Sequence, residues 1–260
     1  MAGTRIGSGV VRRWLGRAVV RPVEARMAAL VRAEVDRAVR EVHDVEFRSR
    51  RDLLAAGERD AAVSSARFAA SVMPTARAFH DPVSTLEFGL QIAPRGGMAL
   101  EFGVFEGRSL TSIARSRGGE QVYGFDAFQG LPEDYRPHVR TGAFALDRRP
   151  DVEGAELVVG WFDDTLPAFL AEHPGPVDFL HVDGDLYSSA VTVLREVGPR
   201  LHAGSVVVFD EFFNFPGWEQ HEYRAWCEYL ADSGAEISYE AYTSNNEQVV
   251  ARIIDPGRPV

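Results

Sequence analysis

The spacing of apolar side chains changes along the chain and divides it into two parts. Between Val23 and Arg51 apolar residues recur in alternating steps of four and three, which predicts a long helix. The residues that set this spacing are Val31, Val35, Ala38, Val42 and Val45. The same steps are those of a heptad seam, so the helix is interpreted either as packing on its own domain or as a dimerisation arm.

Short apolar runs that alternate with helical stretches begin at Met98. The strand-like runs are MALEF, QVYGF, AELVV, VDFLHV and SVVVF, and stretches such as SLTSIARS and SSAVTVLREV separate them. Because these runs are apolar throughout, they predict a parallel sheet that helices cover on both faces. The last runs, AEISYEAY and QVVARII, flank SNN and predict an antiparallel hairpin. We therefore expect a helical extension over residues 1–90 and a doubly wound α/β domain over residues 91–260.

Composition and charge exclude several classes of protein. A net charge of −10 over 260 residues argues against general nucleic-acid binding, because phosphate contacts need clustered basic side chains. No apolar run approaches the roughly 20 residues that span a bilayer, and the N-terminus lacks a signal-peptide pattern, so we expect a cytoplasmic protein without a membrane partner. The single cysteine, Cys227, forms no internal disulfide and is interpreted as a packing residue.

The first strand-to-helix turn of the α/β domain, LEFGVFEGRS, carries a pair of glycines. In doubly wound sheets the ligand lies beyond the carboxyl ends of the strands, where this turn is expected. Gly103 and Gly107 let a ligand approach the backbone, and Ser109 lies near the N-terminus of the following helix. The turn departs from the dinucleotide pattern GxGxxG because position 105 is Phe and Glu101 precedes the first glycine. An acid at that place suits a cationic amino group better than a pyrophosphate.

A carboxylate and two aromatic side chains follow the next two strands. Asp126 ends VYGFD, 23 residues after Gly103, the place from which a carboxylate accepts the ribose hydroxyls of an adenosine. Dinucleotides and S-adenosylmethionine both contain this ribose, so Asp126 indicates a nucleoside without saying which. Trp161 and Phe162 follow AELVV and could stack on an adenine ring, although Trp161 is equally well interpreted as closing the core.

The stretch VDGDLYSS places acids directly after a buried strand, where an unpartnered carboxylate is costly. In the usual strand order the next strand is its neighbour, so Asp183 is expected beside Asp210 and Glu211. Carboxylates this close share protons or a cation, and oxygen ligands select Mg²⁺ or Ca²⁺ over zinc. We therefore expect a divalent ion on Asp183, Asp210 and Glu211. The alternative is that one acid contacts the amino group of the nucleoside ligand while the others are solvated.

Taken together, these motifs resemble class I S-adenosylmethionine-dependent methyltransferases, and among them the macrocin-type O-methyltransferases that act on sugars of macrolide antibiotics. The resemblance runs from about Ala99 to Trp226 and rests on LEFGVFEGRSL, VYGFDAFQGLPED, GWFDDTLP, FLHVDGDLYSS and VVVFDEFFNFPGWEQHE. It implies a mostly parallel, seven-stranded Rossmann-like sheet, methyl transfer to a hydroxyl, and Mg²⁺ on the three acids named above. Glu211 stands where macrocin-type members commonly have Asp, and residues 1–90 match no family that we can name.

The resemblance also implies which residues bind S-adenosylmethionine. They combine the glycine turn with the acids and aromatic residues at the strand ends: Glu101, Gly103, Val104, Gly107, Ser109, Asp126, Trp161, Phe162 and Asp183. The cofactor carries the reactive methyl group, so the protein's part is to align and activate the acceptor hydroxyl. The acceptor stays open among a macrolide sugar, another glycoside and a phenolic metabolite, although a negative site disfavours polyanions.

The expected catalytic residues are Asp183, which follows from the metal hypothesis, and a base that accepts the hydroxyl proton. The candidate bases are Asp185, His138 and His221. His138 is favoured because it lies in the polar segment 129–150, which is too long for a connector and is interpreted as a lid. His181 lies deeper on its strand and is interpreted as a core histidine with satisfied hydrogen bonds.

Two other functions remain open. A nicotinamide-dependent dehydrogenase shares the sheet and Asp126, but it lacks the pyrophosphate turn and leaves the acids after the fifth strand unexplained. A non-catalytic partner protein that keeps the nucleoside pocket and assembles through its N-terminal helix would bind cofactor tightly and form no product. The heptad-like spacing itself favours a homodimer.

Overall fold

The computed structural model describes residues 8–258, with side chains described from residue 24 onward. The chain divides into two compact units, residues 1–56 and 57–260. The sequence analysis placed the boundary at residue 90, whereas α2 (Leu53–Val72) already buries Ala61, Ser65 and Ala69. These small residues recur at helical spacing, and Ala61 and Ala69 pack into the core of the second unit. Residues 57–90 therefore belong to the same compact unit as the sheet.

Helix α1 (Ser8–Ser49) makes up most of the first unit and matches the long helix expected there. Val31, Val35, Val42 and Val45 on this helix are all exposed. The heptad-like stripe of this helix is thus made of exposed side chains. A homodimer through this stripe remains a prediction.

The second unit alternates strands and helices, as the apolar runs predict. Its strands are β1 (Arg77–Phe79), β2 (Met98–Phe102), β3 (Val122–Asp126), β4 (Glu156–Val159), β5 (Val177–Val182), β6 (Leu201–Phe209), β7 (Glu236–Thr243) and β8 (Val249–Asp255). Its helices after α2 are α3 (Pro82–Ile92), α4 (Arg108–Arg117), α5 (Phe162–Glu172), α6 (Tyr187–Val197) and α7 (Glu222–Ser233). Two short 3₁₀ helices, η1 (Gly198–Arg200) and η2 (Trp218–Gln220), complete it.

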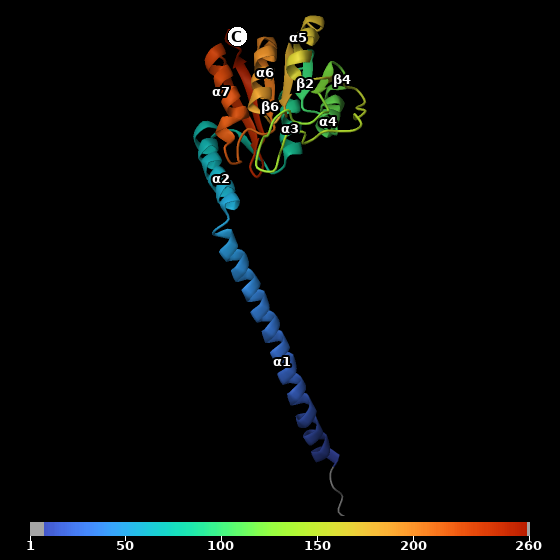
Figure 1. Ribbon diagram of the computed structural model, residues 1–260, viewed down its shortest axis with the longest axis vertical. Coiled ribbons are helices and arrows are strands. Elements are labelled where there is room, and N and C mark those ends of the chain that lie inside the picture. The colour runs from blue at the N-terminus through green and yellow to red at the C-terminus, as the bar shows by residue number, and fades with distance from the viewer. Residues whose placement is uncertain (1–7, 259–260) are drawn as a thin grey trace, which may run out of the picture. The chain divides into compact units, whose positions relative to one another are not determined.

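The eight strands form one sheet in the order β1-β7-β8-β6-β5-β2-β3-β4. Figure 1 shows β6, β2 and β4 following one another in this order across the sheet. Strand β8 is antiparallel to both of its neighbours, and the other pairs are parallel. The α/β class is confirmed, and β7 and β8 form the antiparallel pair expected at the end of the chain. The sequence predicted seven strands, and the structure adds an eighth, β1, which pairs with β7 at the sheet edge. Its three residues are too few to show a period in the sequence.

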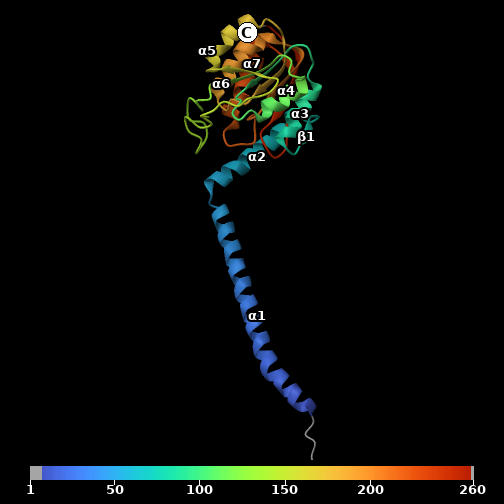
Figure 2. The ribbon, with the colours of Figure 1, turned by 90° about the vertical axis from the view of Figure 1, so that its right-hand side faces the viewer.

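Helices cover both faces of the sheet, with α5, α6 and α7 on one side and α3 and α4 on the other (Figure 2). The reason is that side chains along each strand alternate between two apolar cores. Leu100 and Phe102 of β2 lie in the core that α5, α6 and α7 cover. Ala99 of the same strand lies in the core that α3 and α4 cover. Loops connect the strands and helices at the two ends of the strands. The loops at the carboxyl ends form the candidate site.

A buried polar cluster closes the opposite edge, where the parallel strands begin. Arg117 at the end of α4 pairs with Asp178 of β5 at 3.2 Å. The Asp178 carboxylate also accepts the backbone N–H of Gly97 at 2.6 Å and lies 2.8 Å from Nε2 of His202 on β6. Burial opposes ionisation, but the hydrogen bonds from Gly97, His202 and Arg117 lower the pKa of Asp178 below its ordinary value. The cluster ties α4, β5 and β6 together.

Two narrower expectations concern the membrane and the cysteine. Among the described residues, no helix combines the length and the apolar character that a membrane crossing needs. Cys227 is exposed and is not the packing residue that the sequence suggested. Its neighbour Trp226 is fully buried on α7, and each further helical residue turns about 100° around the axis, which carries Cys227 to solvent.

Candidate active site

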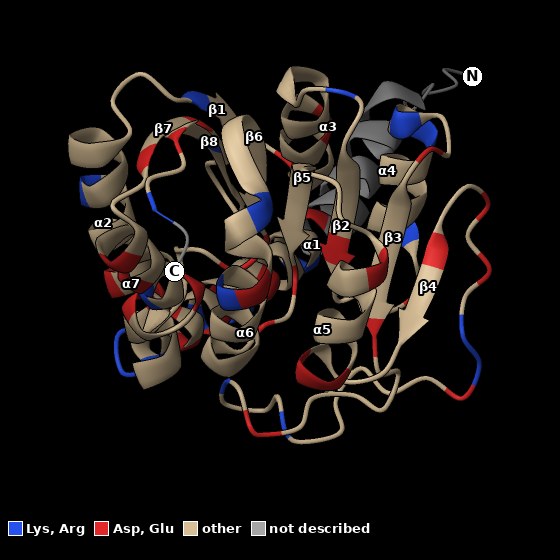
Figure 3. Ribbon diagram, turned by 90° about the horizontal axis from the view of Figure 1, so that it is seen from above, with Lys and Arg blue, Asp and Glu red and all other residues tan. Residues whose placement is uncertain are grey.

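The carboxyl ends of the parallel strands meet at one edge of the sheet, and acidic residues gather there (Figure 3). A cavity of about 540 Å³ opens at this edge, a volume typical of small-molecule sites. The expected site residues that line it are Gly103, Asp126, Trp161, Phe162, Asp183, Asp185 and Glu211. The sequence did not single out several further lining residues, among them Phe105, Phe144, Asp163, Asp164 and Ser188.

Gly103 brings two loops of the site into direct contact. Its backbone has φ +96°, and a Cβ at this position would lie 1.7 Å from the carbonyl oxygen of Asp183. Gly107, with φ +77°, caps the N-terminus of α4, and a Cβ there would meet the Val152 side chain at 2.7 Å. Both glycines of LEFGVFEGRS are therefore required by close approach as well as by backbone conformation.

Asp126 organises the turns on both sides of it. Its Oδ2 accepts the backbone N–H groups of Val104 and Phe105, each at 2.9 Å, and its Oδ1 accepts that of Phe128 at 2.6 Å. A carboxylate oxygen accepts two hydrogen bonds, so Oδ2 is saturated while Oδ1 keeps one place for a ligand. The sequence predicted that Asp126 accepts ribose hydroxyls, but it did not predict these hydrogen bonds to the backbone. Val104 and Phe105 belong to a separate turn that only folding brings next to Asp126.

Four of the residues expected to bind cofactor do not line the cavity: Glu101, Val104, Gly107 and Ser109. Glu101 is fully buried, with Oε1 2.9 Å from Nδ1 of His181. Burial raises the pKa of Glu101, and contacts with His181 and Ser109 oppose that rise. The sequence analysis expected Glu101 to face a cationic amino group, whereas the histidine is its partner in the structure.

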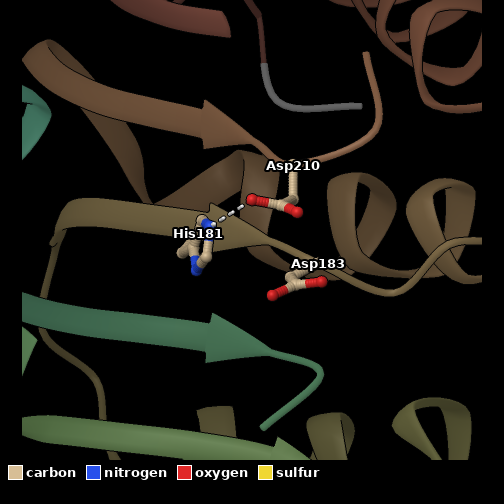
Figure 4. A group of neighbouring side chains, drawn as sticks. All are labelled: His181, Asp183 and Asp210. Atoms are coloured by element: carbon tan, nitrogen blue, oxygen red, sulfur yellow. Dashed lines mark ion pairs between the residues drawn. The ribbon is translucent and has the colours of Figure 1, made fainter. Parts of the chain in front are cut away.

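An acid centre lies where β5 and β6 end. His181, Asp183 and Asp210 each offer a ligand atom within 4.8 Å of the others (Figure 4). His181 Nε2 lies 3.8 Å from Asp210 Oδ1. Although burial opposes its charge, contacts with Asp210 and Glu101 raise the pKa of His181 well above its ordinary value. Burial and the neighbouring Asp210 raise the pKa of Asp183, which is the response expected of carboxylates held close together.

Two glutamates extend this centre: Glu211 lines the cavity, and Glu222 is buried next to Glu211. Glu222, at the first position of α7, is fully buried, and its Oε2 accepts the backbone N–H of Glu211 at 3.1 Å. Glu222 Oε1 and Glu211 Oε2 are buried without a hydrogen-bond partner. Burial, followed by Asp210, raises the pKa of both glutamates. The sequence analysis missed Glu222, because an acid in the first turn of a helix ordinarily faces solvent.

Asp185 is the candidate base that the cavity exposes. Burial raises the pKa of Asp185 to about 7, a rise that Arg136 opposes and Asp210 supports. Its backbone has φ +61°, a conformation that non-glycine residues rarely adopt and that recurs at functional sites. Phe105 and Phe144, which also line the cavity, share this left-handed conformation, with φ values of +45° and +66°.

The two candidate histidines lie elsewhere. His138 is exposed on segment 129–150, with φ +75°, and is not among the described residues that line the cavity. His221 is half-buried, with its ring 5.0 Å from that of Tyr135. Burial and the nearby Arg136 lower the pKa of His221. The geometry therefore favours Asp185 over His138, the base that the sequence favoured.

Segment 129–150 contributes Gly130, Leu131, Pro132 and Phe144 to the cavity wall. It is anchored by Arg136, whose guanidinium binds both oxygens of Glu247 at 3.0 and 2.6 Å. The same guanidinium lies 3.5 Å from the centre of the Phe215 ring. A forked ion pair of this kind fixes direction as well as distance. Whether the segment opens as a lid remains a prediction.

Residues 100–212 match a family model described as a methyltransferase domain. The matched range contains the glycine turn, Asp126 and the three acids after β5 and β6 that the sequence singled out. The family match and the cavity thus coincide in the chain.

Two curated relatives and one solved structure resemble the chain. The 8-demethyl-8-(2,3-dimethoxy-alpha-L-rhamnosyl)-tetracenomycin-C 4'-O-methyltransferase of Streptomyces olivaceus is 30% identical over 141 residues, 45% of this chain and 53% of that protein. The demethyldecarbamoylnovobiocin O-methyltransferase of Streptomyces niveus is 29% identical over 159 residues, 50% of this chain and 58% of that protein. The chain thus spans a little over half the length of these relatives. The crystal structure of the calicheamicin methyltransferase CalS11 superposes with a TM-score of 0.54 and 26% identity, over 65% of this chain and 76% of that one.

Proposed function

We propose that this chain, whose residues 100–212 match a family model described as a methyltransferase domain, transfers a methyl group from S-adenosylmethionine to a hydroxyl of a small natural product such as a glycoside. The observation that carries the proposal is the cavity within that domain, which combines the glycine turn, Asp126 and an acid centre. The relative from Streptomyces olivaceus is named for a rhamnosyl acceptor, which supports a sugar hydroxyl as the methylated group.

The cofactor is proposed to lie against the turn at Gly103, because this residue lines the cavity and has no side chain to hold a ligand away from the backbone. The remaining place on Asp126 Oδ1 would accept one ribose hydroxyl. The Phe162 ring packs edge-on against Phe102 at 5.2 Å, so it is held by the core. Trp161, which lines the cavity beside it, is the better candidate to stack on adenine.

The acid centre fits a divalent cation by its donor set. Asp183 and Asp210 supply carboxylate oxygens close together, and Glu211 carries a buried oxygen without a partner. We infer that these three residues would hold Mg²⁺, since oxygen donors suit that ion. Such an ion would lower the pKa of the acceptor hydroxyl and fix its direction. His181 shares this centre but is engaged with Glu101, so we assign it to positioning Asp210.

Methyl transfer is an in-line displacement. The acceptor oxygen attacks the methyl carbon, a C–O bond forms, and the C–S bond breaks with its electron pair leaving on S-adenosylhomocysteine. The hydroxyl proton must pass to a base, and Asp185 is proposed for this role because it lines the cavity with a pKa near neutrality. The protein's contribution is the alignment of the two reactants and the exclusion of water by segment 129–150.

The test of this function begins with binding. Calorimetric titration of EDTA-stripped protein with S-adenosylhomocysteine should give a micromolar dissociation constant, and no binding would refute the proposal. Transfer of labelled methyl to a panel of glycosides should then require added Mg²⁺ and should disappear in Asp183→Asn. The exposed Asp232→Asn on α7 serves as the matched control and should keep full activity. Undiminished turnover in excess EDTA would exclude the metal site while leaving methyl transfer intact.

A further inference from the structure

The acid loop, residues 210–217, joins the end of β6 to η2 and begins with Asp210 and Glu211. These two residues supply carboxylates to the proposed cation site. A binding site needs its ligand atoms held to within a fraction of an ångström, whereas an unsupported connection adopts many conformations. Whatever holds the acid loop therefore also sets the position of the two carboxylates.

Two backbone N–H groups of the acid loop donate to distant parts of the chain. The N–H of Phe212 donates to the carbonyl oxygen of Glu247, in the turn before β8, at 3.1 Å. The N–H of Asn214 donates to Oγ of Ser65 on α2 at 2.8 Å. The acid loop is thus held by α2 as well as by the turn between the last two strands.

The hydrogen bond to Ser65 fixes the middle of the acid loop. Ser65 is 3% exposed, so water has little access to take the place of its hydroxyl. Asn214 has φ +68°, a left-handed conformation that turns the chain at this point. Because an unpaired buried N–H is costly, the bond favours the one loop conformation in which Asn214 reaches Ser65.

Ser64, the preceding residue of α2, holds the end of the acid loop. It accepts the indole N–H of the buried Trp218, with Nε1 3.0 Å from Oγ. The Ser64 hydroxyl itself donates to the carbonyl oxygen of Ala61 at 3.0 Å, which directs the hydroxyl oxygen toward the indole. An indole has a single donor, so α2 satisfies the hydrogen bonding of the Trp218 side chain.

Phe68, one helical turn further along α2, packs among aromatic rings that belong to the acid loop and its surroundings. Its ring centre lies 6.1 Å from that of Phe212, 5.5 Å from that of Trp218 and 5.3 Å from that of Tyr223 on α7. Phe212 directly follows Glu211 in the sequence. Helix α2 thus contacts the acid loop next to its acids and again where the loop ends.

We propose that α2 is a positioning element of the acid centre, in which Ser65 and Ser64 hold the acid loop and, through it, the carboxylates of Asp210 and Glu211. Helix α2 precedes residues 100–212, so the family match by itself gives it no role. The inference rests on the proposed cation site. It gives this part of the N-terminal segment a role within the protein that is separate from dimerisation through α1.

The test is a titration with Mg²⁺ alone, by calorimetry, of EDTA-stripped protein saturated with S-adenosylhomocysteine. Ser65→Ala removes only the hydroxyl and keeps a good helix former. We expect the dissociation constant for Mg²⁺ to rise about three- to tenfold, the range that corresponds to one net hydrogen bond. The affinity for S-adenosylhomocysteine should stay within about twofold, because its proposed contacts at Gly103 and Asp126 belong to other segments.

The possible failures of this titration are distinguishable. If wild-type protein binds Mg²⁺ and Ser65→Ala binds it equally well, the inference about α2 is overturned and the proposed cation site stands. If wild-type protein binds S-adenosylhomocysteine but no Mg²⁺, the cation site is refuted and the inference fails with it. If wild-type protein does not bind S-adenosylhomocysteine, the proposed function fails before any variant is compared.

Two control variants separate positioning from general stability. Ser71→Ala removes an exposed hydroxyl of the same helix, which donates to the carbonyl oxygens of Arg67 and Phe68, and it should keep the wild-type affinity for Mg²⁺. Ile253→Val trims a fully buried core side chain on β8 and should lower stability without changing that affinity. Equal weakening of Mg²⁺ binding by Ile253→Val and Ser65→Ala would show general destabilisation and would overturn the inference.

Amide hydrogen exchange gives a readout that needs no cation. In the metal-free protein, Ser65→Ala and Ser64→Ala should each speed exchange in peptides that cover residues 210–217, because each removes a hydrogen bond that holds the acid loop. Exchange in β3, residues 122–126, should stay at the wild-type rate. Unchanged exchange in the acid loop of both variants would overturn the inference.

Discussion

Asp126 offers a test that separates ligand binding from protein architecture. Its carboxylate accepts three backbone N–H groups, from Val104, Phe105 and Phe128. In Asp126→Asn the amide oxygen can replace only one of the two carboxylate oxygens. If it faces Val104 and Phe105, the amide NH₂ opposes the N–H of Phe128. The reverse orientation loses two bonds, so the first one is expected.

The magnitude follows from these contacts. One charge-assisted hydrogen bond is lost, which costs about 1.5–3 kcal/mol, and the two retained bonds lose their charge assistance, which roughly halves them. Asp126 is half-buried at the cavity wall, so water replaces part of the loss. We therefore expect the free energy of unfolding of the ligand-free protein to fall by about 2–4 kcal/mol.

The assay is urea unfolding followed by tryptophan fluorescence, in parallel with titration by S-adenosylhomocysteine. Asp126→Asn should lose both stability and affinity. Glu120→Gln, an exposed carboxylate just before the same strand, is the matched control and should change neither. If Asp126→Asn unfolds at the wild-type urea concentration and yet binds no ligand, its backbone bonds are dispensable and Asp126 acts on the ribose alone.

Three further predictions concern other parts of the fold. Gly103→Ala should abolish S-adenosylhomocysteine binding, because its Cβ would lie 1.7 Å from a backbone oxygen in the loop after β5. The control is Gly118→Ala, where φ is +71° but no atom would lie near the new Cβ. This variant should cost only about 1 kcal/mol of stability in urea unfolding. Hydrogen bonds lower the pKa of Asp178 against the opposing effect of burial, so its stabilisation is present above the ordinary Asp range and is lost as pH falls through the lowered pKa. Asp178→Asn should therefore be less stable at neutral pH and should flatten the acid limb of a stability curve; an unchanged limb would refute this assignment. Arg136→Gln and Glu247→Gln should each speed proteolysis within segment 129–150, and a double variant no faster than either single one would show that they act as one pair, while additive rates would show that they do not.

Periodicity and residue type predicted much of this molecule. Continuous apolar runs such as VDFLHV can be satisfied only by burial on both faces, so they predicted the parallel sheet before any coordinate was known. The rule that parallel strands end at one edge then predicted Gly103, Asp126 and Asp183 at a common cavity. Such predictions succeed because they depend on local chemistry and on topology, which the chain carries in its order.

Only the tertiary structure showed which site residues contact one another, because those contacts join side chains from separate segments of the chain. Glu101 and Asp183 both belong to strand-end motifs, yet one is sealed against His181 while the other lines the cavity. Both point to the same face of the sheet, because Glu101 is paired with His181 and Asp183 follows His181 by two residues. They differ in depth, since Glu101 lies within β2 against the His181 ring whereas Asp183 lies just beyond the end of β5. Glu222 reaches the acid centre only because η2 and the turn before α7 return the chain to the end of β6.

The sequence by itself determined the order of strands and helices, the acidic character of the site and the glycines that the turns require. Only the tertiary structure decided that Asp126 serves the backbone, that Asp185 rather than His138 lines the cavity, and that the acids of α5 reach the ligand space. The physical reason is how far apart along the chain the interacting residues lie. Propensity and burial act between neighbours along the chain, whereas the direction and charge state of a side chain depend on groups that folding brings together from distant segments.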